Sequence, residues 1–387
     1  MSRSESDNGH LGFLISGFAS LFVISFLDNS RGPILPVLCA KLKIPYETAG
    51  TFLTIGCIAA VISTFSLGYF LKRKSERQVA LGIALFCLVP GIVAPFVDSV
   101  ATLLLLGALM GSAVTLMGTM TNILTIKGSP SHLRGRHLSL QQMMYGIGSL
   151  LAPLAFRNLI RLDLDWSWML VGCSVAIFIL GIAFYILLPS EPFAPLPVQE
   201  KKKLSVQAYL VAALFAIYVG GEVLASMWMS TLIVGHQGKP PEVAAVYGMG
   251  FFALIGATRF LCFLFVKPKW ETRILVASLI AGIIASILGQ RGITTALPFI
   301  GLLGPFFPLC MARISRQFPD DWKAMTIYVF IAIQAMLALM HQSVGSIADV
   351  LGIENAFVLC PVLLTIALGL LFQNVRASEA TKLPSSL

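Results

Sequence analysis

Charge-free apolar stretches of about 20 residues recur from one end of the chain to the other, and no other feature restricts its fold as strongly. Each stretch is long enough to cross a bilayer as an α-helix, and the continuous rather than alternating pattern excludes a β-barrel. Only 12% of the residues are charged, about half the fraction usual in soluble domains, and the mean hydropathy is +0.86. We therefore predict an integral membrane protein in contact with the lipid bilayer, which excludes a soluble enzyme, a nucleic-acid binder and a receptor with a single anchor.

The apolar stretches predict an all-α protein with twelve transmembrane helices. No cleavable signal peptide is expected, because residues 1–10 are polar and the first stretch is too long for a signal sequence. The expected spans lie near residues 11–38, 47–71, 78–97, 100–126, 138–157, 166–189, 205–235, 242–266, 273–290, 294–315, 323–348 and 354–375.

The longest polar segment between spans divides the twelve helices into two groups of six. We expect an N-terminal six-helix bundle over residues 1–190, a linker over 191–204 and a C-terminal six-helix bundle over 205–387. A basic run at 72–77 follows the second helix, and a similar run at 267–273 follows the eighth. Two such halves predict a pseudo-symmetric transporter with its site near the membrane midplane, the alternative being a duplicated scaffold without transport.

The net charge of +9 is a topology signal rather than a sign of nucleic-acid binding. If the N-terminus is cytoplasmic, most of the 27 lysines and arginines lie in cytoplasmic segments. The opposite side holds only Lys41, Lys43, Arg157, Arg161, Lys239 and Arg291. The positive-inside rule therefore places both termini in the cytoplasm. Short loops and the lack of an N-x-S/T sequence favour a bacterial inner membrane.

Motifs for metal, cofactor or nucleotide chemistry are missing. The seven cysteines lack ligand spacing, the histidines form no i,i+4 pair, and there is no Walker A, HExxH or GxSxG sequence. We therefore expect no enzyme activity, no cofactor, no metal and no ATP site, so that transport runs on ion gradients.

Asp28 and Arg31 lie midway along the first span at i,i+3, so they share a helix face and can pair. Pro33 and Pro36 follow and bend the helix where a substrate could meet free carbonyls. The pair is either a self-neutralising support for this bend or part of the transport site.

Glu222 lies midway along the seventh span and has no cation within a turn on its own helix. We therefore expect an unpaired carboxylate that favours its protonated form, as a proton carrier requires. The alternative is a neutral acid that hydrogen-bonds a neighbouring helix.

Further polar residues in the spans are candidates for binding a neutral polyol. They are Gln141 and Gln142 on the fifth span, Gln334 and His341 on the eleventh, and Trp228, whose ring could cover the C–H face of a sugar. Interhelical hydrogen bonds and packing are the alternatives for the glutamines and the histidine. Arg259 on the eighth span is predicted to be a gate or a snorkelling charge rather than a substrate ligand.

The run at 72–77, with Gly68 before it, resembles the loop signature of the major facilitator superfamily, although Lys72 replaces its acid. The stretch from Asn122 to Gly148 is similar to the fucose–galactose–glucose:proton symporter family, with an Asn, a Gly-x-Pro loop and L-x-L-x-Q-x-x-x-x-x-G. The segments at 218–222, 304–308 and 345–349 resemble the seventh, tenth and eleventh helices of that family.

This resemblance implies a sugar-binding amide at Gln142 and a polar first-helix position at Asn29, and it adds Asn122 and Tyr145 as substrate-binding candidates. The family's acids fall on Gly118 and Gly32, so proton coupling must move to Asp28 or Glu222. His341 replaces a proline of the family. Gating is assigned to Arg259 together with Arg77 and Arg273, which end the two basic runs.

The sequence thus predicts a monomeric secondary transporter that moves a small polar solute, such as a sugar or polyol, by alternating access with protons. A rival function is export of organic anions or amphipathic compounds, with Arg31 binding the anion. A sensor or an intramembrane enzyme is disfavoured, because there is no soluble domain and no nucleophile–base pair.

Overall fold

The computed structural model describes residues 3–71, 74–130, 133–190, 206–265, 268–318 and 322–380. The expected linker at 191–204 lies outside the described residues, as does Lys72. The helices are α1 (Arg3–Leu42), α2 (Tyr46–Leu71), α3 (Glu76–Val93), η1 (Ala94–Phe96), α4 (Val100–Gly128), α5 (Arg134–Arg161), α6 (Ser167–Leu187), α7 (Val206–Gly235), α8 (Pro241–Phe265), η2 (Pro268–Trp270), α9 (Glu271–Gln290), η3 (Thr294–Leu303), α10 (Phe306–Gln317), α11 (Trp322–Leu351), α12 (Ile353–Ala356) and α13 (Leu359–Ala380).

Twelve helical segments within the described residues are long and apolar enough to cross a membrane, which confirms the predicted number of spans. Local sequence explains several of their ends. Ser75 and Ser99 each accept a hydrogen bond from the backbone three residues later, so α3 and α4 begin with capping boxes. A positive φ of 90° at Gly352 turns the chain from α11 into α12.

The tenth span differs from the expected continuous helix at 294–315. Its first half is the 3-10 helix η3, and the chain then turns at Gly304 and Pro305 before α10 begins. Proline lacks a backbone N–H, and Gly304 approaches α8 so closely that a Cβ would lie 2.6 Å from the carbonyl oxygen of Ile255. The break frees backbone carbonyls in the interior of the protein.

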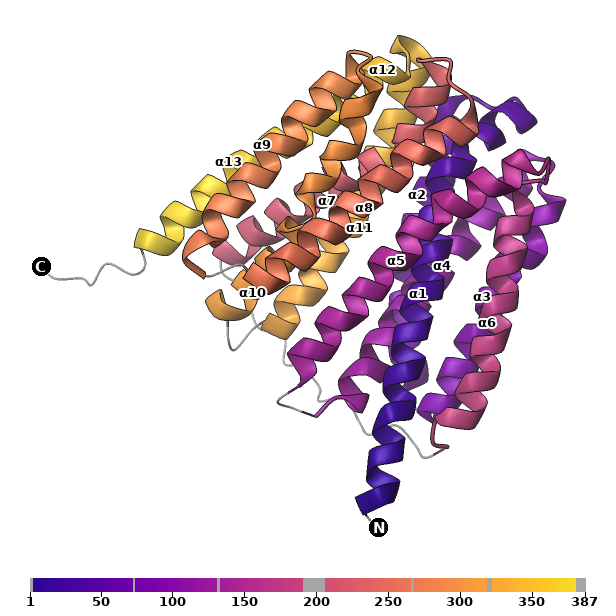
Figure 1. The fold of residues 1–387 in the computed structure, drawn as a ribbon, viewed down its shortest axis with the longest axis vertical. Helices are drawn as coiled ribbons and strands as arrows, with labels where there is room; N and C mark the ends of the chain where they lie inside the picture. The colour runs from indigo at the N-terminus through magenta and orange to yellow at the C-terminus, as the bar shows by residue number, and fades with distance from the viewer. Residues whose placement is uncertain are drawn as a thin grey trace, which may run out of the picture.

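The helices form two bundles that lie side by side, one of α1–α6 and one of α7–α13 (Figure 1). Each bundle has six spans, and the contacts within the two bundles match. In the first bundle α1 packs on α4 and α5, α2 on α4, and α3 on α6. In the second, α7 packs on α11, α8 on η3, and α9 on α13. The bundles meet where α1 contacts α7, α2 contacts α11, and α5 contacts α8. The last two contacts are equivalent by pseudo-symmetry, because α2 corresponds to α8 and α5 corresponds to α11. The predicted all-α fold with two pseudo-symmetric bundles is confirmed.

Glycines allow helices to approach closely within and between the bundles. A Cβ on Gly111 of α4 would lie 2.0 Å from the carbonyl oxygen of Gly56 on α2. A Cβ on Gly345 of α11 would lie 2.5 Å from the carbonyl oxygen of Tyr46. In a membrane, helix association is not driven by the hydrophobic effect, because the lipid is as apolar as the side chains. Small residues at helix interfaces instead allow close van der Waals contact between the backbones.

Candidate functional site

A cavity of about 140 Å³ lies between the two bundles. Seven helices line it: α1, α2, α4 and α5 from one bundle and α7, α8 and α11 from the other. Its polar lining consists of Asp28, Asn29, Arg31, Thr115, Tyr145, Ser149, Glu222, Ser226, Arg259, Gln334 and His341. Charged residues in the membrane interior are expensive unless paired, so a cavity with two acids and two arginines is a candidate transport site.

Asp28 and Arg31 pair on α1, as the i,i+3 spacing predicts. The side chain of Asp28 is only 17% exposed and that of Arg31 only 14%, and the Nη2 atom of Arg31 contacts Oδ1 of Asp28. The Nε of Arg31 also donates to the backbone carbonyl of Asp28 at 3.0 Å. The arginine is therefore held along its own helix by two contacts.

Helix α5 contributes a second partner for Asp28. The hydroxyl of Tyr145 donates to Oδ2 of Asp28 at 3.1 Å. Asn29 in turn donates to the Tyr145 hydroxyl at 3.3 Å and to Ser149 Oγ at 2.9 Å. These bonds tie α1 to α5, and they fix the orientation of the carboxylate at the cavity wall.

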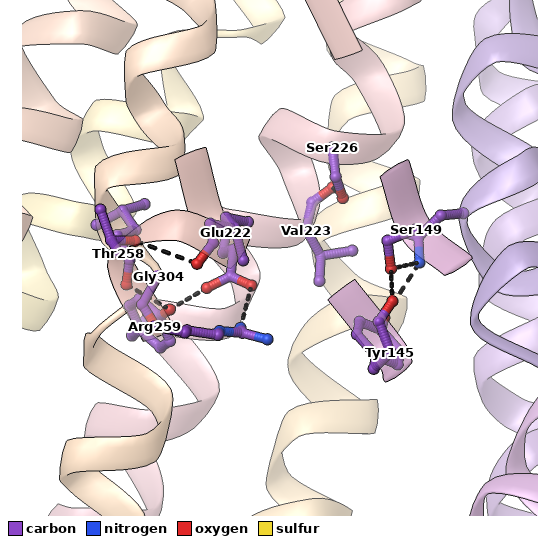
Figure 2. A network of polar contacts seen from close by, with 12 residues as sticks. Tyr145, Ser149, Glu222, Val223, Ser226, Thr258, Arg259 and Gly304 are labelled. Atoms are coloured by element: carbon purple, nitrogen blue, oxygen red, sulfur yellow. Dashed lines mark hydrogen bonds and ion pairs between the residues drawn. The ribbon is translucent and has the colours of Figure 1, made fainter. Parts of the chain in front are cut away.

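Glu222 on α7 also contacts an arginine and a tyrosine, as Asp28 does. Nη2 of Arg259 on α8 lies 3.5 Å from Oε1 of Glu222, and the Tyr218 hydroxyl donates to Oε2. Figure 2 shows the Glu222 carboxylate and the Arg259 guanidinium directed at each other, with Tyr145 and Ser149 across the site. The expectation of an unpaired Glu222 is therefore wrong, because its cation comes from the neighbouring helix rather than from α7.

The break between η3 and α10 supports this second acid. The Nε of Arg259 donates to the carbonyl of Gly304 at 3.1 Å, and the Tyr218 hydroxyl lies 3.3 Å from the carbonyl of Leu303. The two residues that hold Glu222 are thus both anchored on carbonyls next to the break. A discontinuous helix at mid-membrane depth is a common feature of transporter sites.

His341 on α11 is 2% exposed and lines the cavity next to the inter-bundle contact of α2 and α11. The indole N–H of Trp228 on α7 donates to Nδ1 of His341 at 3.1 Å. Trp228 itself is fully buried and does not line the cavity, so its contact with the site runs through the histidine.

The remaining sequence candidates lie outside the cavity lining, except Gln334, which belongs to it. Gln141 is fully buried and donates to Thr121 at 3.0 Å, which joins α5 to α4. The side chains of Gln142 and Asn122 are exposed, as is that of Arg273. The guanidinium of Arg77 lies 4.0 Å from the ring centroid of Tyr185, between α3 and α6 on the flank of the bundle.

The sequence did not single out Tyr218 and Ser149, which support the site, or Asp349, which joins the two bundles. Tyr218 precedes Glu222 by four residues and Ser149 follows Tyr145 by four, so helical spacing could have linked both to their partners. Asp349 lies away from the cavity, at the far end of the bundle interface, and accepts hydrogen bonds from the backbone N–H groups of Tyr46 and Glu47. No local signal in the sequence indicates that contact, because it joins residues about 300 positions apart.

Solved structures with a similar fold span nearly the whole chain. A bacterial homolog of the human lysosomal transporter Spinster, in an inward-facing and unoccupied conformation, has a TM-score of 0.72 with 13% identity, and all of both chains is covered. A D-xylose–proton symporter has a TM-score of 0.70 with 13% identity, over 94% of this chain and 96% of that one. A peptide transporter in complex with sulfate has a TM-score of 0.70 with 12% identity, over 95% and 94%.

At these identities the structures show a shared fold and leave the substrate open. No curated protein sequence matches the chain. The family model described as Major Facilitator Superfamily matches residues 17–306, which is well over half of the chain. Together with the twelve spans in two six-helix bundles, this match shows that the chain belongs to the Major Facilitator Superfamily and is a membrane transporter.

Proposed function

We propose that the protein is a proton-coupled secondary transporter that moves a small polar solute of the sugar or polyol class by alternating access. The observation that carries this proposal is the polar cavity between the bundles, where two acids face a space lined by hydrogen-bonding groups from both halves. The similarity to the fucose–galactose–glucose:proton symporter family supports the same class of substrate. The proposed setting is a bacterial inner membrane with both termini in the cytoplasm and the protein as a monomer.

In this proposal Glu222 and Asp28 carry the coupling protons. Asn29, Arg31, Tyr145, Gln334 and His341 contact the solute, because all of them line the cavity. Arg259 acts on the carboxylate of Glu222 rather than as a gate at the membrane surface. Arg77 and Arg273 keep their proposed part in gating.

Export of organic anions is the second candidate. Its support is that two guanidinium groups, Arg31 and Arg259, line the same cavity from opposite bundles. An anion would enter a site in which two fixed positive groups are already desolvated.

Uptake into proteoliposomes, with and without a pH gradient, tests the proposal. Wild-type protein is expected to accumulate a sugar or polyol against its gradient only when protons flow inward. Glu222→Gln should abolish this accumulation while counterflow exchange survives, because exchange needs binding but no net proton movement. Glu242→Gln, at the first turn of α8 and away from the cavity lining, is the matched control. Proton-driven accumulation by Glu222→Gln would contradict the assignment of Glu222.

A further inference from the structure

The two acids of the cavity have no carboxylate oxygen without a partner. Each of Asp28 and Glu222 holds an arginine on one oxygen and a tyrosine on the other. A neutral polyol is both donor and acceptor, and the first acceptors it would seek are carboxylates. Here each of those oxygens already has one partner, and the two arginines neutralise the acids, so the carboxylates are weaker acceptors for the hydroxyl groups of a solute than free carboxylates are.

The two guanidinium groups, in contrast, keep unused donors. A guanidinium has five N–H groups. Arg31 and Arg259 each use Nε and Nη2 for the contacts described above, and within the described part of the chain their Nη1 groups have no hydrogen-bond partner. Gly56 lies next to Nη1 of Arg31, since a Cβ built on this glycine would be 3.7 Å from that atom. Because glycine has no side chain, Nη1 of Arg31 stays open to the cavity.

His341 supplies a third donor. Because the Trp228 indole can only donate, the Nδ1 that receives its hydrogen bond must be unprotonated, and the proton of the neutral ring lies on Nε2. Among the residues that the structure describes, Nε2 of His341 has no hydrogen-bond partner, and this atom is not fully buried. It therefore remains available to an acceptor in the cavity.

We propose that the transported solute carries a carboxylate as well as hydroxyl groups, as a sugar acid does, and that its carboxylate binds the unused donors of Arg31, Arg259 and His341. This inference rests on the proposed function and narrows its substrate class. The hydroxyl groups of the solute would meet Gln334 and Ser226, which also line the cavity. Charge-assisted bonds to guanidinium are stronger than neutral ones, so the carboxylate would dominate recognition.

The same arrangement couples the solute to a proton. The contact of Glu222 with Arg259 spans 3.5 Å, so an incoming carboxylate can replace it with a closer pair. The released Glu222 then takes up one proton from the bulk solution at Oε1, while Oε2 keeps the hydrogen bond from Tyr218. One carboxylate enters with one proton, so the net charge of the site is unchanged. The other charged or titratable groups lining the cavity are Asp28, Arg31, Cys57, Tyr145 and His341.

Binding of matched acids and neutral compounds to the purified full-length protein tests the proposal. Gluconate and sorbitol share an open six-carbon chain, and glucuronate and glucose share a ring, so each pair differs chiefly in the carboxylate. At constant ionic strength, calorimetry should show that at least one acid binds about tenfold or more tightly than its neutral partner. In weakly buffered solution its binding should also take up one proton per acid bound.

Variants separate the roles of the three donors. Arg259→Gln should remove the preference for the acid, whereas Arg161→Gln, an exposed arginine at the end of α5, should leave it unchanged. His341→Gln retains an N–H near the position of Nε2 and should keep most of the affinity, but His341→Leu should lose it. Glu222→Gln should still bind the acid and no longer take up the proton.

The wild-type measurements decide the proposal even if a variant fails to fold. Equal affinity for the acid and the neutral partner in both pairs, no binding of either acid, or acid binding without proton uptake would each overturn it. Proton-driven transport of a neutral sugar would overturn this inference and leave the proposed function standing. Failure of a pH gradient to drive uptake of any of the four probes would instead count against the proposed function itself.

Discussion

At the scale of single residues, the site consists of two acids that each bind one arginine and one tyrosine. Asp28 and Arg31 lie on one helix, while Glu222 and Arg259 lie on α7 and α8 of the same bundle. A rocking motion of one bundle against the other therefore leaves both ion pairs intact. A change in pairing must come from the solute or from a proton, which is what coupling requires.

The Asp28–Arg31 pair can be tested with a double-mutant cycle. Removing one partner strands a charge that is more than four-fifths buried, so Arg31→Ala and Asp28→Asn should each lower stability by about 1–3 kcal/mol. The double variant should recover much of this loss and still transport nothing, because the site lacks its donor. Thermal unfolding in detergent and uptake in proteoliposomes measure the two effects.

The exposed pair of Lys41 and Asp165 is the control for this cycle. Its atoms lie 2.9 Å apart with both side chains more than 40% exposed, so the coupling should stay below about 1 kcal/mol. A double variant of Asp28 and Arg31 that regains both stability and uptake would show that the pair only supports the helix.

At the scale of helices, α2 and α11 form a latch between the bundles. The carboxylate of Asp349 near the end of α11 accepts the backbone N–H groups of Tyr46 at 2.8 Å and of Glu47 at 2.7 Å. These N–H groups begin α2 and have no partner within their own helix. A carboxylate at a helix N-terminus is also favoured by the helix dipole, so this contact holds the bundles together on that side.

Loss of the latch should favour opening between α2 and α11. Asp349→Asn removes the charge at an exposed helix N-terminus, which is worth about 1 kcal/mol or roughly a fivefold change in population. Cys39 lines a neighbouring cavity together with Tyr46 and Asp349, so its labelling by a bulky thiol reagent should become about fivefold faster. Mass spectrometry of the labelled peptide measures the rate.

Glu354→Gln is the control for the latch, because that acid contacts His236 within its own bundle at 3.3 Å. Faster labelling in the control, or unchanged labelling in Asp349→Asn, would exclude a latch at this position.

At the scale of the whole molecule, the two bundles lie side by side (Figure 1) and have matching helix contacts, and the cavity is lined by helices from both. The helix pairs α3 with α6 and α9 with α13 lie on the flanks, and α1 and α7 lie inside. The acids of the two halves occupy corresponding helices, Asp28 on α1 and Glu222 on α7. Symmetry of the fold thus explains why each bundle brings one acid to the same space.

The proposed orientation in the membrane rests on the positive-inside rule and can be measured with reporter fusions. A fluorescent protein fused to the C-terminus should fluoresce, because the proposed orientation keeps it in the cytoplasm. Alkaline phosphatase inserted at Gly238, in the turn between α7 and α8, should be active on the opposite side. The reverse pattern would invert the proposed topology and the direction from which the cavity is reached.

The sequence alone determined the membrane class, the twelve spans, the division into halves and the Asp28–Arg31 pair. All of these depend on neighbours in the chain: transfer of an apolar stretch into lipid is a sum over consecutive residues, and an i,i+3 pair needs only one helix turn. The partner of Glu222, which comes from another helix, and the break that anchors Arg259 depend instead on how the helices pack against each other. The tertiary structure also decided that Gln141 is buried while the neighbouring Gln142 is exposed, since packing sets the rotation of α5.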